Sequence, residues 1–507
     1  MEGIVEMDEP SGVGGWVFAA ENELAELVDE VRGYRNSLGS RGMSTLEFLE
    51  QFSYLLFMKL AAEDRDAGLS GQPHHAARLW DTLRGRRGDD LERQYRHVLG
   101  ELAKSSGTSG AVYARAQNRI GDPALLERLI VDLVGGHDWY PKGTRILGGL
   151  FEDFLQKSVG ENLEAGNFLT PRPLIQAIVD VMQPRSDDVI VDPACGSAGF
   201  LIAAHQYIAR RLAMISKDEL ERLSAGTIRG MEIKDRRACL AVMNMLLHGI
   251  GRVNGDALVT VEDVLEDKPS AYASLVLLDP PFGRRSRDPG NDGADELEGK
   301  AYQRDDFVTT TKSTHLNLVQ HAMTLLDRGG RAAVIVPDNL LYQTGAGEKI
   351  RRRLLQNFDV HTLLRLPAGI FYKQGVKANV LFFDKKSPHA DGSPVTTEIW
   401  VYDFRTGQHF TGRNKPLQRS DLDDFVMQFK PGVDRSERKK SSRFRPISHK
   451  ELVARHKVNF DIAWPIDDYD DADVRLAPGV VAREIADELL AAHDEFMAIA
   501  DALEIVE

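Results

Sequence analysis

The sequence contains very little cysteine and no long apolar run. Among its 507 residues only Cys195 and Cys239 are cysteines, which excludes a disulfide framework and a four-cysteine metal site. No run approaches the ~20 apolar residues of a membrane-spanning helix. The acidic start of the chain, MEGIVEMDEP, lacks a signal-peptide pattern. We therefore expect a protein of the reducing cytoplasm that does not enter a membrane.

Net positive charge is also missing. The 63 lysines and arginines are outnumbered by 77 aspartates and glutamates, for a formal net charge of −14. Because phosphate groups are bound by clustered cations, a nucleic-acid ligand would require a local basic patch or a second subunit. The 14 histidines show no metal-ligand spacing, so we expect no metal site.

The chain is long enough for about two to four domains. Residues 1 to about 140 show helical periodicity, as in STLEFLEQFSYLLFMKLAAE (44–63), and predict an N-terminal helical domain over 1–140. At the other end, the stretch from 478 begins with proline and glycine and then shows the pattern of one amphipathic helix. We expect residues 466–507 to form a separate helical tail.

From about residue 187, short β-branched runs alternate with helical stretches. This alternation predicts an α/β fold with a parallel sheet and helices on both faces. Such sheets bind ligands at the carboxyl ends of their strands. We predict helices over 200–214, 234–248, 313–327 and 347–357. The predicted strands cover 188–192, 227–232, 274–279, 331–337, 360–367 and 378–384.

The stretch VIVDPACGSAGFLIAA (189–204) is typical of a strand, a small-residue turn and a helix. Glycine lets the backbone approach a ligand closely, and a helix start offers unpaired N–H groups. A dinucleotide fingerprint would have three glycines, whereas only Gly196 and Gly199 follow Asp192 here. The Asp192 carboxylate would repel a pyrophosphate and suits a ligand with an ammonium group.

Two further acids extend this pattern. Glu232 ends the next predicted strand, where an acid can bind ribose hydroxyls. Asp256, in NGDAL (254–258), lies where we expect a third strand to end and could accept a hydrogen bond from an exocyclic amine. Together the acids fit a cofactor with an amine, a ribose and an adenine but no phosphates, such as S-adenosylmethionine. The alternative is that each acid caps a helix or lies in a solvated loop.

Several motifs together resemble the amino-methylating DNA methyltransferases. DPACGSAGF (192–200) is followed by DPPF (279–282), and segments 166–182, 327–342, 365–385 and 400–426 are similar to the modification subunit of type I restriction–modification systems. The resemblance covers nearly the whole chain. It implies a Rossmann-like, S-adenosylmethionine-dependent methyltransferase sheet within a domain over 141–465, preceded by the helical domain and followed by the helical tail.

The resemblance also implies functions for individual residues. By resemblance, Asn167 to Arg172 and the loop Ser197 to Gly199 would contact the cofactor, with Glu232 on the ribose hydroxyls. We extend the second segment to Asp192 and add Asp256 with Ala257. Two departures from the family are visible: Ala198 replaces a more usual glycine, and Asp279 a more usual asparagine, although related adenine methyltransferases use aspartate. The two cofactor segments comprise Asn167, Phe168, Leu169, Thr170, Pro171 and Arg172, and Asp192, Ala194, Cys195, Gly196, Ser197, Ala198 and Gly199.

The tetrapeptide Asp279, Pro280, Pro281, Phe282 suits methylation of a planar amine. The lone pair of adenine N6 is delocalised into the ring. Acceptors on its hydrogens, here the Asp279 carboxylate and the Pro280 carbonyl held by the following proline, would favour a pyramidal nitrogen that can attack a methyl group. The base must flip out of the duplex to reach them, and Phe282 would stack on it for ~1–3 kcal/mol. Arg284, Arg285 and Arg287 follow at once as candidate DNA contacts.

We therefore predict a site-specific adenine DNA methyltransferase. An enzyme of the same fold acting on cytosine N4, on RNA or on a protein amide stays an alternative, as does a cofactor-binding scaffold without catalysis. As partners, the resemblance implies a separate DNA-specificity subunit that binds residues 478–507 and two copies of this chain per complex. The sequence shows neither the DNA recognition site nor whether a restriction nuclease subunit accompanies the complex.

Overall fold

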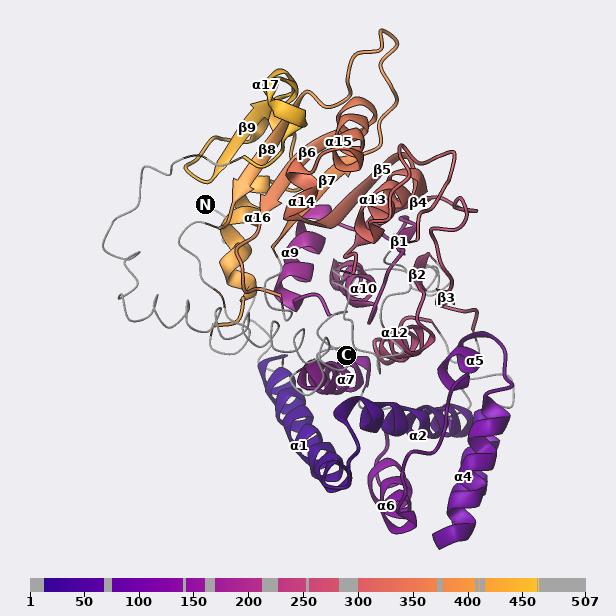
Figure 1. Ribbon diagram of the computed structural model, residues 1–507. Coiled ribbons are helices and arrows are strands. Elements are labelled where there is room, and N and C mark those ends of the chain that lie inside the picture. The colour runs from indigo at the N-terminus through magenta and orange to yellow at the C-terminus, as the bar shows by residue number, and fades with distance from the viewer. Residues whose placement is uncertain are drawn as a thin grey trace, which may run out of the picture.

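The computed structural model describes residues 13–67, 75–139, 143–159, 169–211, 227–251, 255–281, 300–371, 377–405, 410, 415–462 and 464. Within these residues a block of helices lies against one side of a nine-stranded sheet that has further helices on both faces (Figure 1). Among the described residues, no helix has both the length and the apolar character needed to cross a bilayer.

The N-terminal block is helical, as the sequence predicts for its described part. Its second helix starts at a capping box, in which Ser44 Oγ accepts from the Glu47 amide (3.2 Å) and the Glu47 carboxylate accepts from the Ser44 amide (3.0 Å). The helices are α1 (Val13–Gly39), α2 (Thr45–Asp66), α3 (His75–Leu83), α4 (Gly88–Leu102), α5 (Gly107–Tyr113), α6 (Pro123–Arg128), the π-helix η1 (Leu129–Val134) and α7 (Gly143–Val159).

The strand order in the sheet is β3-β2-β1-β4-β5-β7-β6-β8-β9. All six predicted strands are present, and the other three are β3, β8 and β9. The strands are β1 (Ile190–Asp192), β2 (Ile228–Glu232), β3 (Val259–Val261), β4 (Ala273–Leu278), β5 (Leu326–Pro337), β6 (Asp359–Arg365), β7 (Ala378–Asp384), β8 (Glu398–Asp403) and β9 (Phe444–Ser448).

The expectation of a wholly parallel sheet is wrong at β7 and β9. Strands β3, β2, β1, β4 and β5 pair in parallel, whereas β7 is antiparallel to both β5 and β6, and β9 is antiparallel to β8. The described part of the connection between β6 and β7 holds no helix, and a parallel pair requires a crossover that usually contains one. The sheet is therefore mixed.

Two hydrophobic clusters cover the two faces of the sheet. In β4, Leu275 and Leu277 face one cluster, and Val276 and Leu278 face the other, as alternation along a strand requires. The first cluster includes side chains of α9 (Arg172–Met182), α10 (Gly199–Arg211), α12 (Asp235–Leu247) and α16 (Asp423–Phe429). The second includes those of α13 (Thr314–Leu325), α14 (Asp338–Tyr342), α15 (Ala346–Asn357) and α17 (His449–Ala454).

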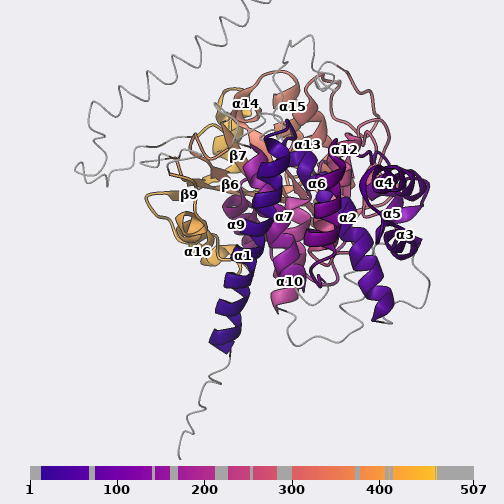
Figure 2. The same cartoon turned by 90° about the horizontal axis from the view of Figure 1, so that it is seen from below.

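The first cluster continues without a break into the N-terminal helices. It contains Phe48 and Phe52 of α2 and Phe151 and Phe154 of α7 together with strand residues. Figure 2, seen from below, shows α1, α2 and α7 lying across this side of the sheet. Short 3-10 turns η3 (Arg419–Leu422), η4 (Arg435–Glu437) and η5 (His456–Val458) complete the described chain. The domain limits at 140 and 465 stay predictions, and the predicted C-terminal helix lies outside the described residues.

Candidate active site

Four acids follow the carboxyl ends of four neighbouring parallel strands. Asp192 ends β1, Glu232 ends β2, Asp263 follows β3 and Asp279 follows β4. Because β3, β2, β1 and β4 are adjacent and parallel, their ends meet at one edge of the sheet. This is the edge at which open α/β sheets bind ligands.

The turn after β1 is tied to its neighbours by backbone hydrogen bonds. Asp192 Oδ1 accepts from the Ala194 amide (3.1 Å), and the Gly196 amide donates to Glu232 Oε2 (3.2 Å). Gly196 has a φ of 54° and Ala198 a φ of 65°, which is the left-handed region that glycine adopts most easily. The usual glycine at position 198 in the family therefore has a conformational reason, and Ala198 is strained here.

Cys195 is a buried residue that packs in this turn. Its thiol is buried, and a Cβ on Gly230 of β2 would lie 2.7 Å from its sulfur. Burial raises the pKa of the thiol well above its usual value, and the nearby carboxylates of Asp192 and Glu232 raise it further. A thiolate, which is the reactive form, is thus disfavoured.

The acids create a buried negative site. Burial raises the pKa of Asp192 well above its ordinary value, and repulsion from Asp279 and Glu232 adds to this effect. Burial also raises the pKa of Glu232, although Glu232 Oε1 accepts from the Lys234 amide (2.9 Å). A cationic ligand among these carboxylates would relieve the repulsion and stabilise their ionised forms.

Asp279 presents an acceptor to this edge. The Thr170 hydroxyl donates to Asp279 Oδ2, whereas Asp279 Oδ1 is buried and has no hydrogen-bond partner among the described residues. Burial raises the pKa of Asp279 to about 7. An orphaned buried acceptor calls for an explanation, and an incoming N–H donor would supply one. Pro280 is buried beside it.

The described half of the first predicted cofactor segment forms a wall of the site. Leu169 is buried, Thr170 contacts Asp279, and Pro171 precedes the first residue of α9, Arg172. The Arg172 guanidinium is bound by the Glu152 carboxylate of α7, with Nε at 2.7 Å from Oε2. Its position, close to Gly199 at the start of α10, is therefore set by α7.

The structure does not place Asp256 and Ala257 at the end of the third strand, where we expected them. Both are exposed and precede β3, and the Asp256 carbonyl accepts from the Thr108 hydroxyl of α5 (2.6 Å). They belong to the connection that reaches β3 at its amino end, on the opposite side of the sheet from the other acids. The strand starts only at Val259, and the short run VTV before Glu262 and Asp263 was the signal for it.

The acid that sequence reasoning missed is Asp263. The neighbouring Glu262 amide donates to the Glu232 carbonyl (3.3 Å), which keeps this turn beside the end of β2. Asp263 Oδ1 accepts from the Leu265 amide (3.1 Å), and Oδ2 accepts from the Tyr302 hydroxyl (2.8 Å). Asp263 thus occupies the position at the sheet edge that we had expected for Asp256.

The remaining predicted site residues lie outside the described part of the chain. They are Asn167, Phe168, Phe282, Arg284, Arg285 and Arg287.

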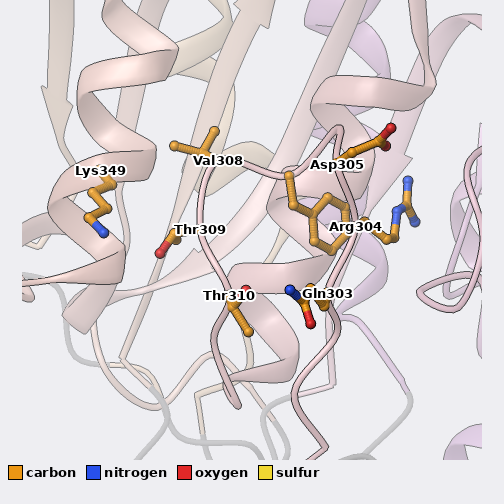
Figure 3. Close-up of a pocket in the computed structure, with 8 residues that line it drawn as sticks. Gln303, Arg304, Asp305, Val308, Thr309, Thr310 and Lys349 are labelled. Atoms are coloured by element: carbon orange, nitrogen blue, oxygen red, sulfur yellow. The ribbon is translucent and has the colours of Figure 1, made fainter.

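A pocket lies beside the segment 300–313 that leads into α13. The buried side-chain amide of Gln320 holds this segment, since it forms hydrogen bonds with both the amide and the carbonyl of Thr309 (3.0 and 3.1 Å). Gln303, Thr309, Thr310 and Lys349 of α15 are among the residues that line an open pocket of about 820 Å³ (Figure 3).

Comparison with known proteins places the chain in a family. Residues 142–466 match the family described as N-6 DNA Methylase. The type I restriction enzyme StySJI methylase subunit of Salmonella typhimurium is 32% identical, over 94% of this chain and 94% of that protein.

Solved structures agree with this match. The crystal structure of the type I restriction enzyme EcoKI M protein aligns with a TM-score of 0.51 and 27% identity, over 94% of this chain and 96% of that one. A structure from work on complex assembly and conformational transition of the type I R-M system has the same fold, with a TM-score of 0.70, 24% identity and coverages of 96% and 97%. With its four acids at the sheet edge and these matches along nearly its whole length, the chain belongs to the N-6 DNA methylase family, among the methylase subunits of type I restriction enzymes.

Proposed function

We propose that this chain binds S-adenosylmethionine at the carboxyl edge of its sheet and transfers the methyl group to N6 of an adenine flipped out of duplex DNA. The observation that carries the proposal is the row of Asp192, Glu232, Asp263 and Asp279 on four adjacent strand ends. These four acceptors match a cationic cofactor at one end and an amine substrate at the other.

The donor and acceptor chemistry of the residues fits this cofactor. Asp192 is buried beside other carboxylates, and an ammonium group next to it would offset their repulsion and favour its ionised form. Glu232 keeps free lone pairs for the two ribose hydroxyls, and Asp263 takes the place of Asp256 as the acceptor for the exocyclic amine of the adenine. When bound, S-adenosylmethionine supplies an electrophilic methyl group attached to a sulfonium.

The walls of the cofactor site would come from two backbone segments. One is the described end of the first predicted segment, Leu169 to Arg172, and we retain Asn167 and Phe168 before it as predictions. The other is the turn after Asp192, comprising Ala194, Cys195, Gly196, Ser197, Ala198 and Gly199.

The chain's own residues prepare the amine for attack. The Thr170 hydroxyl holds Asp279 Oδ2, so that Oδ1 can accept a hydrogen bond from N6. The Pro280 carbonyl would accept from the second hydrogen, and Pro281 restricts the backbone that carries it. With the cofactor bound, the N6 lone pair prepared by these acceptors would attack the methyl group, and the electrons of the C–S bond would pass to sulfur. The N6 nitrogen that carries the new methyl group would be positively charged and strongly acidic, so its proton would pass to water, and Asp279 would act as the hydrogen-bond acceptor.

DNA and partner contacts complete the proposal. Phe282 would stack on the flipped base, and Arg284, Arg285 and Arg287 would contact phosphates next to it. Recognition of the DNA sequence would come from a separate specificity subunit, with two copies of this chain in the complex and, in systems that cleave DNA, a restriction subunit. The similarity to a solved structure from work on type I R-M complex assembly supports assembly with other subunits.

The test is transfer of tritiated methyl groups from S-adenosylmethionine to DNA, RNA and protein by this chain with its specificity subunit. Nucleoside analysis should find N6-methyladenine in DNA. Label in N4-methylcytosine, in RNA or in protein amide instead would support the alternative substrates, and cofactor binding without transfer would indicate a scaffold.

A further inference from the structure

A buried carboxylate of the N-terminal helical block reaches the cofactor site. Glu152 lies on α7, and its side chain is only 17% exposed. Glu152 Oε2 accepts from Arg172 Nε (2.7 Å), and Oε1 accepts both from a second N–H of the same guanidinium and from Asn244 Nδ2 of α12 (2.7 Å). Glu152 thus joins three helices, α7, α9 and α12.

The first connection leads to the wall that holds Asp279. Arg172 is the first residue of α9 and directly follows the stretch whose Thr170 donates to Asp279. Its guanidinium also lies against the start of α10, since a Cβ on Gly199 would be 2.5 Å from Arg172 Nη1. The carboxylate of Glu152 therefore sets the position of the segment from Leu169 to Arg172.

The second connection leads to the turn after β1. Asn244 is fully buried, and its Nδ2 also donates to the Ser197 carbonyl (2.9 Å). Its Oδ1 has no hydrogen-bond partner among the described residues. An unsatisfied buried amide oxygen costs free energy, so packing alone gives no reason for asparagine at this position. Holding the Ser197 carbonyl in place does give one.

The fit between the helices supports the same arrangement. His248 Nδ1 is 2.9 Å from the Asn244 carbonyl, and the ring lies so close to α7 that a Cβ on Gly148 would be 2.5 Å from it. Burial raises the pKa of Glu152. The Arg172 charge and the hydrogen bonds lower it by a larger amount, so the pKa lies below its ordinary value. The carboxylate is thus ionised and paired inside the protein.

We propose that Glu152 is a positioning residue for methyl transfer, which holds the segment 169–172 through Arg172 and the turn 192–199 through Asn244 at the spacing that the cofactor requires. A buried ion pair is often no more stabilising than apolar residues of the same volume, which favours a role in geometry over one in stability. The inference depends on the proposed function, because it assumes that S-adenosylmethionine binds between these two segments.

The test compares Glu152→Gln with Asp153→Asn in the full chain together with its specificity subunit. Asp153 is the next residue on α7 but pairs with Arg32 and Lys157, away from the cofactor turn. We expect Glu152→Gln to raise the calorimetric Kd and the KM for S-adenosylmethionine at least about tenfold, because displaced walls misplace the ligand. The KM for DNA should not change, and Asp153→Asn should behave as the wild type.

A second variant keeps the test decisive if Glu152→Gln folds poorly. Asn244→Ala removes the bond to Ser197 but leaves the pair between Glu152 and Arg172, and it should also weaken cofactor binding. In the double variant, the loss of cofactor affinity should be smaller than the sum of the losses in the two single variants, since both side chains act on the same turn. Glu152→Gln or Asn244→Ala with wild-type cofactor affinity would overturn the inference. A wild-type chain that binds no S-adenosylmethionine would instead refute the proposed function.

Discussion

At the scale of single residues, the aspartate at position 279 has consequences that an asparagine would not have. Its carboxyl has a pKa of about 7 and lies in a buried site with Asp192 and Glu232. Both aspartate and asparagine carry an oxygen that can accept from an amine, but only the aspartate changes its charge near neutral pH. The activity and the stability of the chain should therefore respond differently to pH in the two cases.

Asp279→Ala should abolish methyl transfer and leave cofactor binding within about tenfold of the wild type, because its main contact is with the amine. Asp279→Asn should keep substantial activity. In the wild type, kcat/KM should fall as the pH decreases through about 7, since the carboxyl becomes protonated, whereas the asparagine variant should lack this step. Rates measured from pH 5.5 to 8.5 would check this, and full activity of the alanine variant would contradict the catalytic assignment.

The Asp279 carboxyl should affect the stability of the fold with the opposite dependence on pH. The pKa of Asp279 rises from 3.8 to about 7 on folding, so its contribution to stability is present below pH 4 and is lost as the pH rises through 7. A shift of one pKa unit corresponds to about 1.4 kcal/mol, and solvent reduces this effect because Asp279 is partly exposed. We therefore expect Asp279→Asn to stabilise the cofactor-free chain by only ~1–2 kcal/mol at pH 8. Near pH 4 urea unfolding should show almost no difference. An equal gain at both pH values would argue against ionisation as the cause.

Two neighbouring left-handed residues in the turn offer a matched pair of substitutions. Gly196→Ala should destabilise the chain by ~1–2 kcal/mol, because a Cβ is disfavoured at its φ of 54°. Ala198→Gly should stay within ~1 kcal/mol of the wild type, since relief of strain at a φ of 65° is offset by loss of a buried methyl group. Thermal unfolding would separate the two. A large loss in Ala198→Gly would mean that packing dominates there.

At the scale of elements, the short strand β3 decides which acid lies beside Glu232 at the carboxyl edge of the sheet. It has only three residues, Val259 to Val261. Asp256 before the strand and Asp263 after it therefore lie at opposite edges of the sheet. A shift of a few residues in the predicted strand end was enough to select Asp256 in place of Asp263. The direction of the strand, which is shared with β2, determines which of the two acids lies near Glu232.

Asp263→Ala should weaken S-adenosylmethionine binding by roughly 1.5–3 kcal/mol, the value of a hydrogen bond to a charged acceptor. Asp256→Ala serves as the control and should leave the affinity unchanged, because its side chain is exposed at the opposite edge. Isothermal titration with the cofactor would measure both. If the Asp256 variant lost affinity and the Asp263 variant did not, the assignment of the edge would be wrong.

At the scale of the whole molecule, the helical block and the sheet share one hydrophobic core. The cluster that contains Phe48 and Phe154 also contains Leu275 and Phe382 of the sheet, and Arg236 of α12 pairs with Glu50 of α2. The N-terminal helices are therefore part of the scaffold of the proposed cofactor site. Contacts with a partner on these helices would reach that site through α7 and α12.

The predicted C-terminal helix gives a test of assembly. Deleting residues 478–507 should abolish binding to the specificity subunit and leave cofactor affinity intact, because the acids of the site all lie before residue 280. The full-length chain without its partner should methylate duplex DNA poorly and without choice of sequence. Size-exclusion chromatography with methylation assays would measure both. Site-specific methylation by the isolated chain would instead place target recognition within these 507 residues.

The sequence by itself determined the chemistry and most of the elements. Short β-branched runs predicted six strands, and helical periodicity predicted the N-terminal helices, because both patterns are local features of the sequence. The turn after Asp192 and the tetrapeptide at Asp279 were predictable because the chemistry of each depends on a few consecutive residues. Asp192, Glu232 and Asp279 were accordingly found without the fold, each as the last residue of a β-branched run or the one after it.

Only the tertiary structure decided which distant residues meet. The reversed direction of β7, the placement of Asp263 and the contact of Glu152 with Arg172 and Asn244 depend on how elements pack. Glu152 lies within an ordinary amphipathic helix, and 92 residues separate it from Asn244. No local pattern marks such a pair, because the low dielectric constant and the geometry that join the two side chains exist only after α7 and α12 have packed together.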